Sequence, residues 1–214
     1  MWHPNGVTAD NTYIHNNYVY NNTYGISVQD KSNGTIIENN DIHNSSYDGI
    51  DICNFYGYYP QDTSIRYNKI YNNNQERDNT SGGIWIDEGI LGDEIIIIYN
   101  NIYSNNVYGL LNTSSTNIIN AENNWWGAND GPSGVGPGSG DAVSANVDYD
   151  PWLRKIESFV AKYGDVNIYF TPDSSPSARW RVTIPSKGYD TGWMPFRRYT
   201  KTNNHFWGEY ADTR

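Results

Sequence analysis

Hydrophobic residues recur along the first 125 residues in short groups separated by asparagine and glycine. Within a group they alternate with other residues, as in segments 26–28, 50–52 and 84–86. A period of two is typical of β-strands, because successive side chains of a strand point to opposite faces. Groups of three or four residues bounded by turn residues are too short for helices, so the pattern predicts many short strands.

The short groups belong to an internal repeat. Its anchor is the pattern Asn, any residue, Val or Ile, Tyr or His, Asn or Ser, which begins at Asn17, Asn40, Asn68 and Asn100. A degenerate copy begins at Asn123, so successive anchors lie 23, 28, 32 and 23 residues apart. Isoleucine stands three residues before each complete anchor, at positions 14, 37, 65 and 97, and a Gly-aliphatic pair follows it, at Gly25, Gly49, Gly83 and Gly109.

A repeat of this length that is built from short strands predicts a solenoid. We expect an all-β parallel β-helix of about five coils, in which strands of successive coils pair in parallel about 4.8 Å apart and aliphatic side chains stack inside. Asparagine is expected to recur at the bend because it tolerates the left-handed backbone conformation, and its amide is expected to hydrogen-bond local backbone or the stacked neighbour. A β-sandwich would not repeat one asparagine at one turn of every unit.

Charge divides the chain into two parts. Residues 1–150 carry 18 acidic and 4 basic residues, whereas residues 151–214 carry 6 acidic and 10 basic residues. We therefore expect a β-helix with a C-terminal aromatic cap over residues 1–153 and a small, basic, β-rich tail, possibly an incomplete module, over residues 154–214. Within the tail, residues 156–163 are predicted as two helical turns, and residues 166–170 and 180–184 as strands.

Composition excludes several classes of protein. A net charge of −10 argues against a nucleic-acid partner. No apolar run reaches the roughly 18 residues that a membrane span needs. The single cysteine, Cys53, excludes an intramolecular disulfide framework.

The repeats quoted above resemble the right-handed parallel β-helix repeats of NosD-like and pectate-lyase-like surface proteins. Segments 123–127, 130–134 and 146–153 resemble the end of such domains in secreted microbial proteins. The resemblance covers roughly residues 6–153. It implies the C-terminal part of a right-handed solenoid in a secreted, periplasmic or cell-surface setting, and it implies no single activity.

The end of the solenoid is rich in aromatic residues. Trp125 falls at the repeat position where Val19 and its equivalents point inward, so we expect it to plug the last coil. Trp126, Tyr149 and Trp152 are then expected to cover the exposed end.

Acidic and aromatic residues gather on one predicted outer face. The second and fourth positions after the glycine of each Gly-aliphatic pair are expected to face solvent. The second positions include Ser27, Asp51, Trp85 and Leu111, and the fourth include Cys53 and Asp87, which places Asp51 near Trp85 and Asp87. Insertions at residues 55–60, 73–81 and 89–94 should form loops beside this face. Aromatic rings next to carboxylates suit a sugar. The prediction is therefore binding of a polysaccharide or cell-surface glycan by Asp48, Asp51, Trp85, Asp87, Glu88, Tyr56, Tyr58 and Tyr59, the alternative being an acidic surface without a ligand.

Two other functions stay open. Asp51 and Asp87 are expected to lie diagonally on neighbouring strands, about 7–8 Å apart, near the spacing of an inverting glycosidase pair. These weak candidates would make the protein a polysaccharide hydrolase or lyase. Calcium is possible at Asp51, Asp87 and Glu88, with Asp48 nearby, and no other cofactor is expected. The third interpretation is a structural or adhesive spacer that self-associates end to end through open coils.

Overall fold

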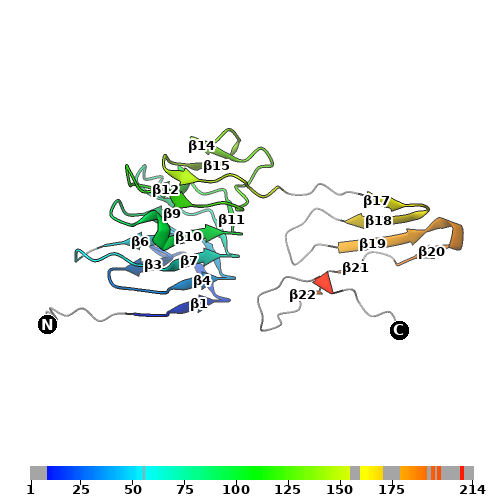
Figure 1. Ribbon diagram of the computed structural model, residues 1–214, viewed down its shortest axis with the longest axis horizontal. Helices are drawn as coiled ribbons and strands as arrows, with labels where there is room; N and C mark the ends of the chain where they lie inside the picture. The colour runs from blue at the N-terminus through cyan, green and yellow to red at the C-terminus, as the bar shows by residue number, and fades with distance from the viewer. Residues whose placement is uncertain are drawn as a thin grey trace. The chain divides into compact units, whose positions relative to one another are not determined.

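The computed structural model of the chain is a stack of parallel β-coils followed by a separate antiparallel unit (Figure 1). It describes residues 9–54, 56–154, 160–170, 179–191, 194–195, 197–198 and 208–209. The chain divides into two compact units, Met1–Arg154 and Lys155–Arg214. No helix in the described part of the chain is both long and apolar enough to cross a membrane. The predicted all-β solenoid is confirmed.

Three parallel sheets, named A, B and C here, form the walls of the solenoid. Sheet A consists of β1 (Tyr13–His15), β4 (Ile36–Glu38), β7 (Thr63–Arg66), β10 (Ile95–Ile98), β13 (Ile119–Asn120) and β16 (Val147–Asp148). Sheet B consists of β2 (Tyr18–Tyr20), β5 (Asp41–His43), β8 (Lys69–Tyr71) and β11 (Asn101–Tyr103). Sheet C consists of β3 (Ile26–Gln29), β6 (Ile50–Cys53), β9 (Gly82–Ile86), β12 (Tyr108–Asn112), β15 (Gly140–Val143) and β14 (Pro132–Gly134).

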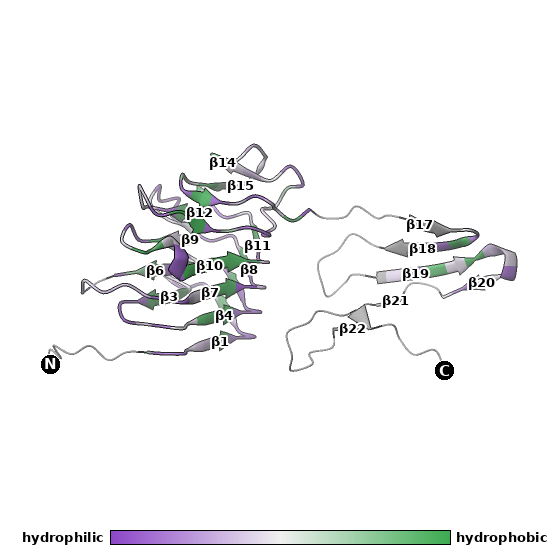
Figure 2. Cartoon of the chain, viewed as in Figure 1, coloured by the Kyte–Doolittle hydropathy of each residue, from purple (hydrophilic) through white to green (hydrophobic). Residues whose placement is uncertain are grey.

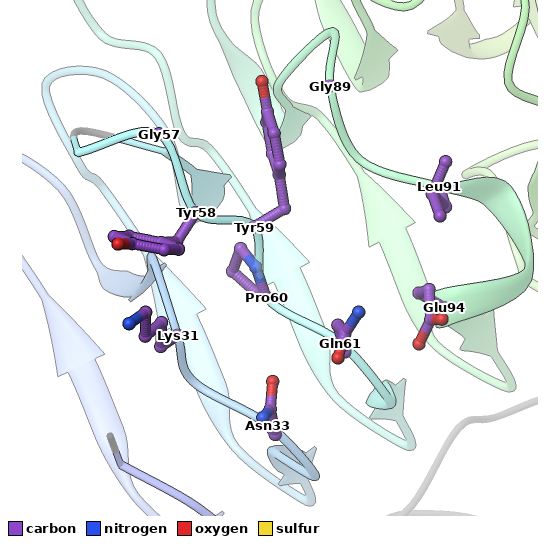
Figure 3. A pocket seen from close by; sticks show the side chains of 10 residues that line it. All are labelled: Lys31, Asn33, Gly57, Tyr58, Tyr59, Pro60, Gln61, Gly89, Leu91 and Glu94. Carbon is purple, nitrogen blue, oxygen red and sulfur yellow. The ribbon is translucent and has the colours of Figure 1, made fainter. Parts of the chain in front are cut away.

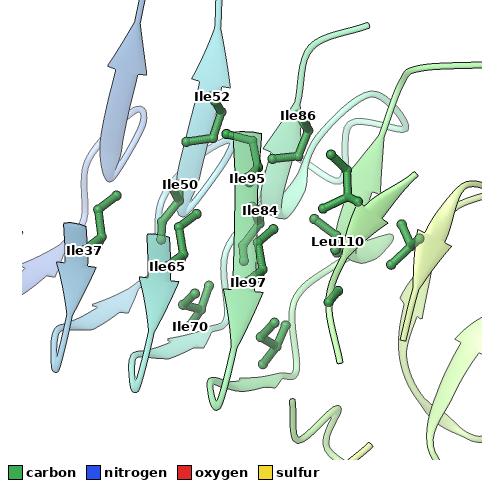
Figure 4. Close-up of a cluster of buried hydrophobic side chains, with 14 of the residues drawn as sticks. Ile37, Ile50, Ile52, Ile65, Ile70, Ile84, Ile86, Ile95, Ile97 and Leu110 are labelled. Carbon is green, nitrogen blue, oxygen red and sulfur yellow. The ribbon is translucent and has the colours of Figure 1, made fainter. Parts of the chain in front are cut away.

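Isoleucine columns fill the inside of the coils. In sheet A, Ile37 pairs with Ile65, and Ile65 pairs with Ile97, so that the three side chains stack (Figure 4). All three are fully buried. Full burial of one such side chain contributes about 1.5–3 kcal/mol, so the columns are the main source of stability. Figure 2 shows the same division, with hydrophobic strands and hydrophilic corners.

In the first four coils the first corner, between sheets A and B, is two residues long: 16–17, 39–40, 67–68 and 99–100. In the last coil residues 123–124 take the equivalent place, before the bridge of Trp125 to Asn101. The first of the two has a positive φ, for example 55° at Asn39 and 58° at Tyr67. The second is the anchor asparagine in the four complete repeats and Asn124 in the last coil, and none of these five residues has a positive φ. Left-handed asparagines do recur at the bends, as predicted, at the last position of the repeat pattern, where Asn21, Asn44 and Asn72 have positive φ. At the first corner, the residue before the anchor makes the turn.

The anchor asparagines form a continuous hydrogen-bonded ladder. Asn68 is representative: its Nδ2 donates to Oδ1 of Asn100 at 3.0 Å, and its Oδ1 accepts from Nδ2 of Asn40 at 3.0 Å and from the backbone N–H of Asn40 at 2.9 Å. The same amide also donates to the carbonyl of Ile37 at 2.9 Å. These bonds satisfy backbone groups that the turn leaves unpaired, which confirms the predicted contact with the stacked neighbour.

The second corner, between sheets B and C, carries a shorter ladder that ends on an acid. Asn73 donates to Oδ1 of Asn105 at 3.0 Å, and Asn105 donates to Oδ2 of Asp141 at 2.8 Å. Next to this ladder, a Cβ on Gly49 would lie 2.7 Å from the carbonyl oxygen of Gly83. Glycine recurs at this point because the backbones of successive coils approach too closely for a side chain.

In the last coil, the residues are shifted by one position relative to the alignment that the repeat predicts. Trp125 forms a parallel bridge with Asn101, so Trp126, and not Trp125, lies next to Ile102 in the interior column. Trp126 is fully buried in the core, and Tyr149 and Trp152 pack against that core. The prediction that Trp125 plugs the last coil is wrong, because the ladder asparagine of this coil is Asn124 and not Asn123.

The tail unit is antiparallel. It contains β17 (Val160–Tyr163), β18 (Val166–Phe170), β19 (Arg179–Ile184), β20 (Tyr189–Asp190), β21 (Met194–Pro195), β22 (Arg197–Arg198) and β23 (Gly208–Glu209). The described residues also include two 3₁₀ turns, η1 (Gly92–Glu94) in the solenoid and η2 (Pro185–Lys187) in the tail unit. The two strands predicted in the tail correspond to β18 and β19. The helical prediction for residues 156–163 is wrong at 160–163, where β17 pairs with β18; residues 156–159 lie outside the described residues.

Candidate functional site

The outer face of sheet C contains the predicted row of acidic and aromatic side chains. Asp51 pairs with Ser27 on one side and with Trp85 on the other, and Trp85 pairs with Leu111, so the predicted register of this row is confirmed. The expectation that the row faces solvent is wrong at its centre. Asp51 is 7% exposed, Leu111 is 9% exposed, and Cys53 at the fourth position is 5% exposed.

The Asp51 carboxylate is engaged within the sheet. Its Oδ1 accepts a hydrogen bond from the hydroxyl of Ser27 at 2.8 Å and one from the thiol of Cys53 at 3.2 Å. Burial raises the pKa of Asp51, and these two hydrogen bonds act in the opposite direction. A carboxylate this buried is not available to a polysaccharide lying on the sheet.

Asp48 lies at the second corner, directly before Gly49 and β6, and not on the outer face. It is 4% exposed, and its Oδ1 accepts the backbone N–H of Gly82 at 2.7 Å. Burial raises the pKa of Asp48 to about 7, and the negative charges of Asp51 and Asp78 add to this effect. Asp48 therefore joins the second coil to the third, and its predicted contact with a glycan does not fit its burial.

Asp87 begins the loop after β9 and is half-buried. Its Oδ2 accepts the backbone N–H of Asn54 at 3.1 Å, and its Oδ1 accepts that of Glu88 at 2.7 Å. Both carboxylates of the predicted catalytic pair thus hold parts of the chain together. Among the residues that the structure describes, no group of three or more His, Cys, Asp or Glu is arranged to bind a metal ion. The calcium candidates Asp51, Asp87 and Glu88 therefore do not form such a group.

A pocket of about 300 Å³ lies at the third corner, between sheets C and A (Figure 3). The third corner comprises the loops 30–35, 54–62, 87–94 and 113–118. The first three loops, which come from successive coils, line the pocket together. We call it the third-corner pocket.

The loops around the pocket are joined by hydrogen bonds between coils. The backbone N–H of Tyr56 donates to Oδ1 of Asp30 at 2.9 Å, which ties the second loop to the first. The backbone N–H of Asp62 donates to Oε2 of Glu94 at 3.2 Å, which ties the second loop to the third. These bonds hold the three loops of unequal length in fixed positions relative to one another, and this arrangement forms the pocket.

One side of the pocket is aromatic and apolar. Tyr58, Tyr59 and Leu91 are 44%, 39% and 50% exposed. The ring of Tyr59 lies so close to Gly89 that a Cβ there would be 2.0 Å from it, and only glycine allows this contact. The ammonium of Lys31 lies 3.8 Å from the centroid of the Tyr58 ring, a cation–π contact that holds both side chains.

The other side of the pocket is polar. Asn33 and Gln61 form a parallel bridge between adjacent coils, which sets their side chains next to each other. Figure 3 shows Lys31, Asn33, Gln61 and Glu94 following one another along this side, with Lys31 next to Tyr58. The pocket therefore combines ring faces with hydrogen-bonding groups.

Sequence reasoning found part of this site. Tyr58 and Tyr59 line the pocket, whereas Tyr56, which is 72% exposed, and the predicted residues Trp85, Asp87 and Glu88 are outside its lining. The polar residues Lys31, Asn33, Gln61 and Glu94 were not predicted. The available signal was that each lies shortly before a strand of sheet A, in loops whose lengths differ from coil to coil.

A second aromatic surface lies on the outer face of sheet B. Tyr20, His43, Tyr71 and Tyr103 stack in one column, with ring centroids 5.4, 4.8 and 5.0 Å apart. Because neighbouring rings cover each other's faces, the column presents mainly ring edges to solvent. Sugars pack against ring faces, so this column is a poorer sugar platform than the third-corner pocket.

The sequence matches the family model described as right handed beta helix region over residues 5–135, which is more than half of the chain. The matched segment includes all three loops of the third-corner pocket. The match is to the general β-helix family and does not distinguish a NosD-like from a pectate-lyase-like protein. Neither the curated proteins nor the solved structures contain a significant match to the chain.

Proposed function

Because this chain belongs to the right-handed β-helix family, with corner loops of successive coils side by side, we propose that it binds a polysaccharide or cell-surface glycan in the third-corner pocket. The observation that carries the proposal is the combination of Tyr58 and Tyr59 with the amides of Asn33 and Gln61 across one pocket. A tyrosine ring offers flat apolar area to the C–H groups of a sugar, and amides exchange hydrogen bonds with its hydroxyls.

The size of the pocket favours a short part of a glycan. Small-molecule sites range from about 300 to 1,000 Å³, and this pocket lies at the lower end. About one or two sugar rings would therefore enter it, while the rest of the chain passes along the loops. Such polymers are exposed outside the cytoplasm, so the proposal includes a secreted, periplasmic or cell-surface location.

The pocket supports binding better than catalysis. Glycoside hydrolysis commonly needs two carboxyl groups on opposite sides of the scissile bond. Glu94 is the single acidic side chain among the described residues that line the pocket. Asp51 and Asp87 are held by hydrogen bonds within the chain, as described above. No observation favours the enzymatic alternative over binding.

The test is a glycan array followed by calorimetry on the full chain and two variants. Tyr58→Ala removes an exposed ring from the pocket and is expected to weaken binding about tenfold, roughly 1.4 kcal/mol. Trp85→Ala alters the outer face of sheet C and is expected to leave affinity unchanged. Loss of binding in Trp85→Ala alone would place the glycan on sheet C, and a blank array with the full chain would refute the proposal.

A control variant separates the site from general surface effects. Tyr18→Ala removes a tyrosine that is 78% exposed on sheet B, outside the pocket lining. Its affinity should equal that of the unmodified chain. Circular dichroism of each variant then checks that the β-sheet content is intact.

A further inference from the structure

The third-corner pocket has opposite charges at its two ends. Lys31 lies at one end with its ammonium against the Tyr58 ring, and Glu94 lies at the other end (Figure 3). Oε2 of Glu94 accepts the backbone N–H of Asp62. Its second oxygen, Oε1, has no hydrogen-bond partner among the described residues. Glu94 is therefore held in place by one oxygen and can offer the other to a ligand.

The surroundings of the pocket are strongly acidic. Asp62, Glu88 and Asp93 are exposed on the same loops, and residues 1–150 carry 18 acidic against 4 basic residues. Charges of one sign around a concave site attract ligands of the opposite sign and repel those of the same sign. These acidic residues would repel a polyanionic glycan along its whole length. Lys31 is the single cation among the described residues of the pocket lining.

Resting on the proposed function, we infer that the third-corner pocket selects a partly N-acetylated amino-sugar chain over neutral and anionic glycans. The protonated amine of one sugar donates to Oε1 of Glu94. The acetyl carbonyl of a neighbouring sugar accepts from Lys31. Hydrogen bonds in which one or both groups are charged are about twice as strong as neutral ones, and the half-buried Glu94 is oriented in advance.

The test compares three probes of equal length by calorimetry: a partly N-acetylated glucosamine oligomer, the fully N-acetylated oligomer and an oligogalacturonate. The full chain is expected to bind the first probe about tenfold more tightly than the second, because one charge-assisted hydrogen bond is lost. The oligogalacturonate should bind most weakly. The preference for the amine should decrease with added salt and at pH values above the pKa of the probe amine.

Two matched variants localise the effect. Glu94→Gln retains an acceptor for the Asp62 N–H but removes the charge, and it should remove most of the tenfold preference, because only the weaker attraction of the surrounding acidic residues remains. Glu88→Gln removes the same charge from an exposed residue outside the pocket lining and should retain the preference.

The outcomes distinguish this inference from the proposed function. Tightest binding of the oligogalacturonate, or an unchanged preference in Glu94→Gln, would overturn the amino-sugar inference while glycan binding stands. If the chain binds none of these probes and no glycan on the array, glycan binding fails, and the amino-sugar inference fails with it.

Discussion

The first and third corners of the solenoid are built from the same repeat but are constrained very differently. The first corner has two residues in each of the first four coils and a ladder of buried asparagines. The third corner ranges from six residues in loop 30–35 to nine in loop 54–62, and Tyr58, Tyr59, Gln61 and Leu91 of its pocket are exposed. The difference shows that coil stacking needs one precise corner, while another is free to vary.

The two corners differ because their backbone N–H and C=O groups have different hydrogen-bond partners. At the first corner, the turn buries N–H and C=O groups that the sheets cannot pair, and each ladder amide satisfies several of them. At the third corner, successive loops pair their backbones at separate points, such as the N–H of Gly34 with the carbonyl of Gln61 at 3.0 Å, and the longer loops reach solvent. Variation is therefore tolerated at the third corner, and the pocket forms there.

The largest effect is expected where the first corner is broken. Asn68→Ala would leave the N–H of Asn40 and the carbonyl of Ile37 without their ladder partner. Since an unpaired buried group costs about 1–3 kcal/mol, the free energy of unfolding should fall by about 3–5 kcal/mol. Urea unfolding followed by circular dichroism measures this change.

Asn22→Ala is the matched control for Asn68→Ala. Asn22 is exposed at the second corner of the first coil, and its side chain makes no hydrogen bond among the described residues. Its replacement should change stability by less than about 0.5 kcal/mol. Equal losses in the two variants would show that asparagine content, and not the ladder, stabilises the coils.

A smaller effect is expected at the second corner, where Asp141 occupies the last ladder position. Burial raises the pKa of Asp141 from 3.8 to about 6. Its contribution to stability is therefore fully present below pH 3.8 and is lost as the pH rises through about 6. Asp141→Asn keeps an acceptor for Asn105 without the charge, so at pH 8 it should be about 2 kcal/mol more stable than the parent.

Urea unfolding of the parent and Asp141→Asn at pH 4 and pH 8 checks this prediction. The two proteins should have similar stabilities at pH 4, where the carboxyl is largely protonated in the fold. Asp48 has a raised pKa of about 7 in both proteins, so its contribution cancels in the comparison. A variant that is less stable at pH 8 would show that the carboxylate serves the ladder better than an amide.

The smallest effect on stability is expected at the third corner. Tyr58→Ala removes an exposed ring and its cation–π contact with Lys31, which is worth about 0.5–1 kcal/mol. The melting temperature should therefore change little, although binding is expected to weaken. A loss comparable to that of Asn68→Ala would mean that the third corner is as constrained as the first.

The sequence by itself determined the repeat, the aliphatic columns and the ladder asparagine. These features depend on chemistry that each coil repeats locally: period-two alternation, a residue that bonds its stacked equivalent, and a glycine where backbones meet. Asp51, Trp85 and Leu111 were aligned correctly for the same reason, because equal offsets from the glycine give neighbouring positions on parallel strands.

The tertiary structure alone decided which aligned residues are accessible and which loops meet. Asp51 is buried although it is on the outer face, and Trp126 took the interior position because the degenerate last repeat shifts by one residue. Lys31 and Glu94, 63 positions apart in the sequence, share one pocket because loops of unequal length follow different paths over successive coils. A local pattern carries no information about such paths, since they depend on packing between coils.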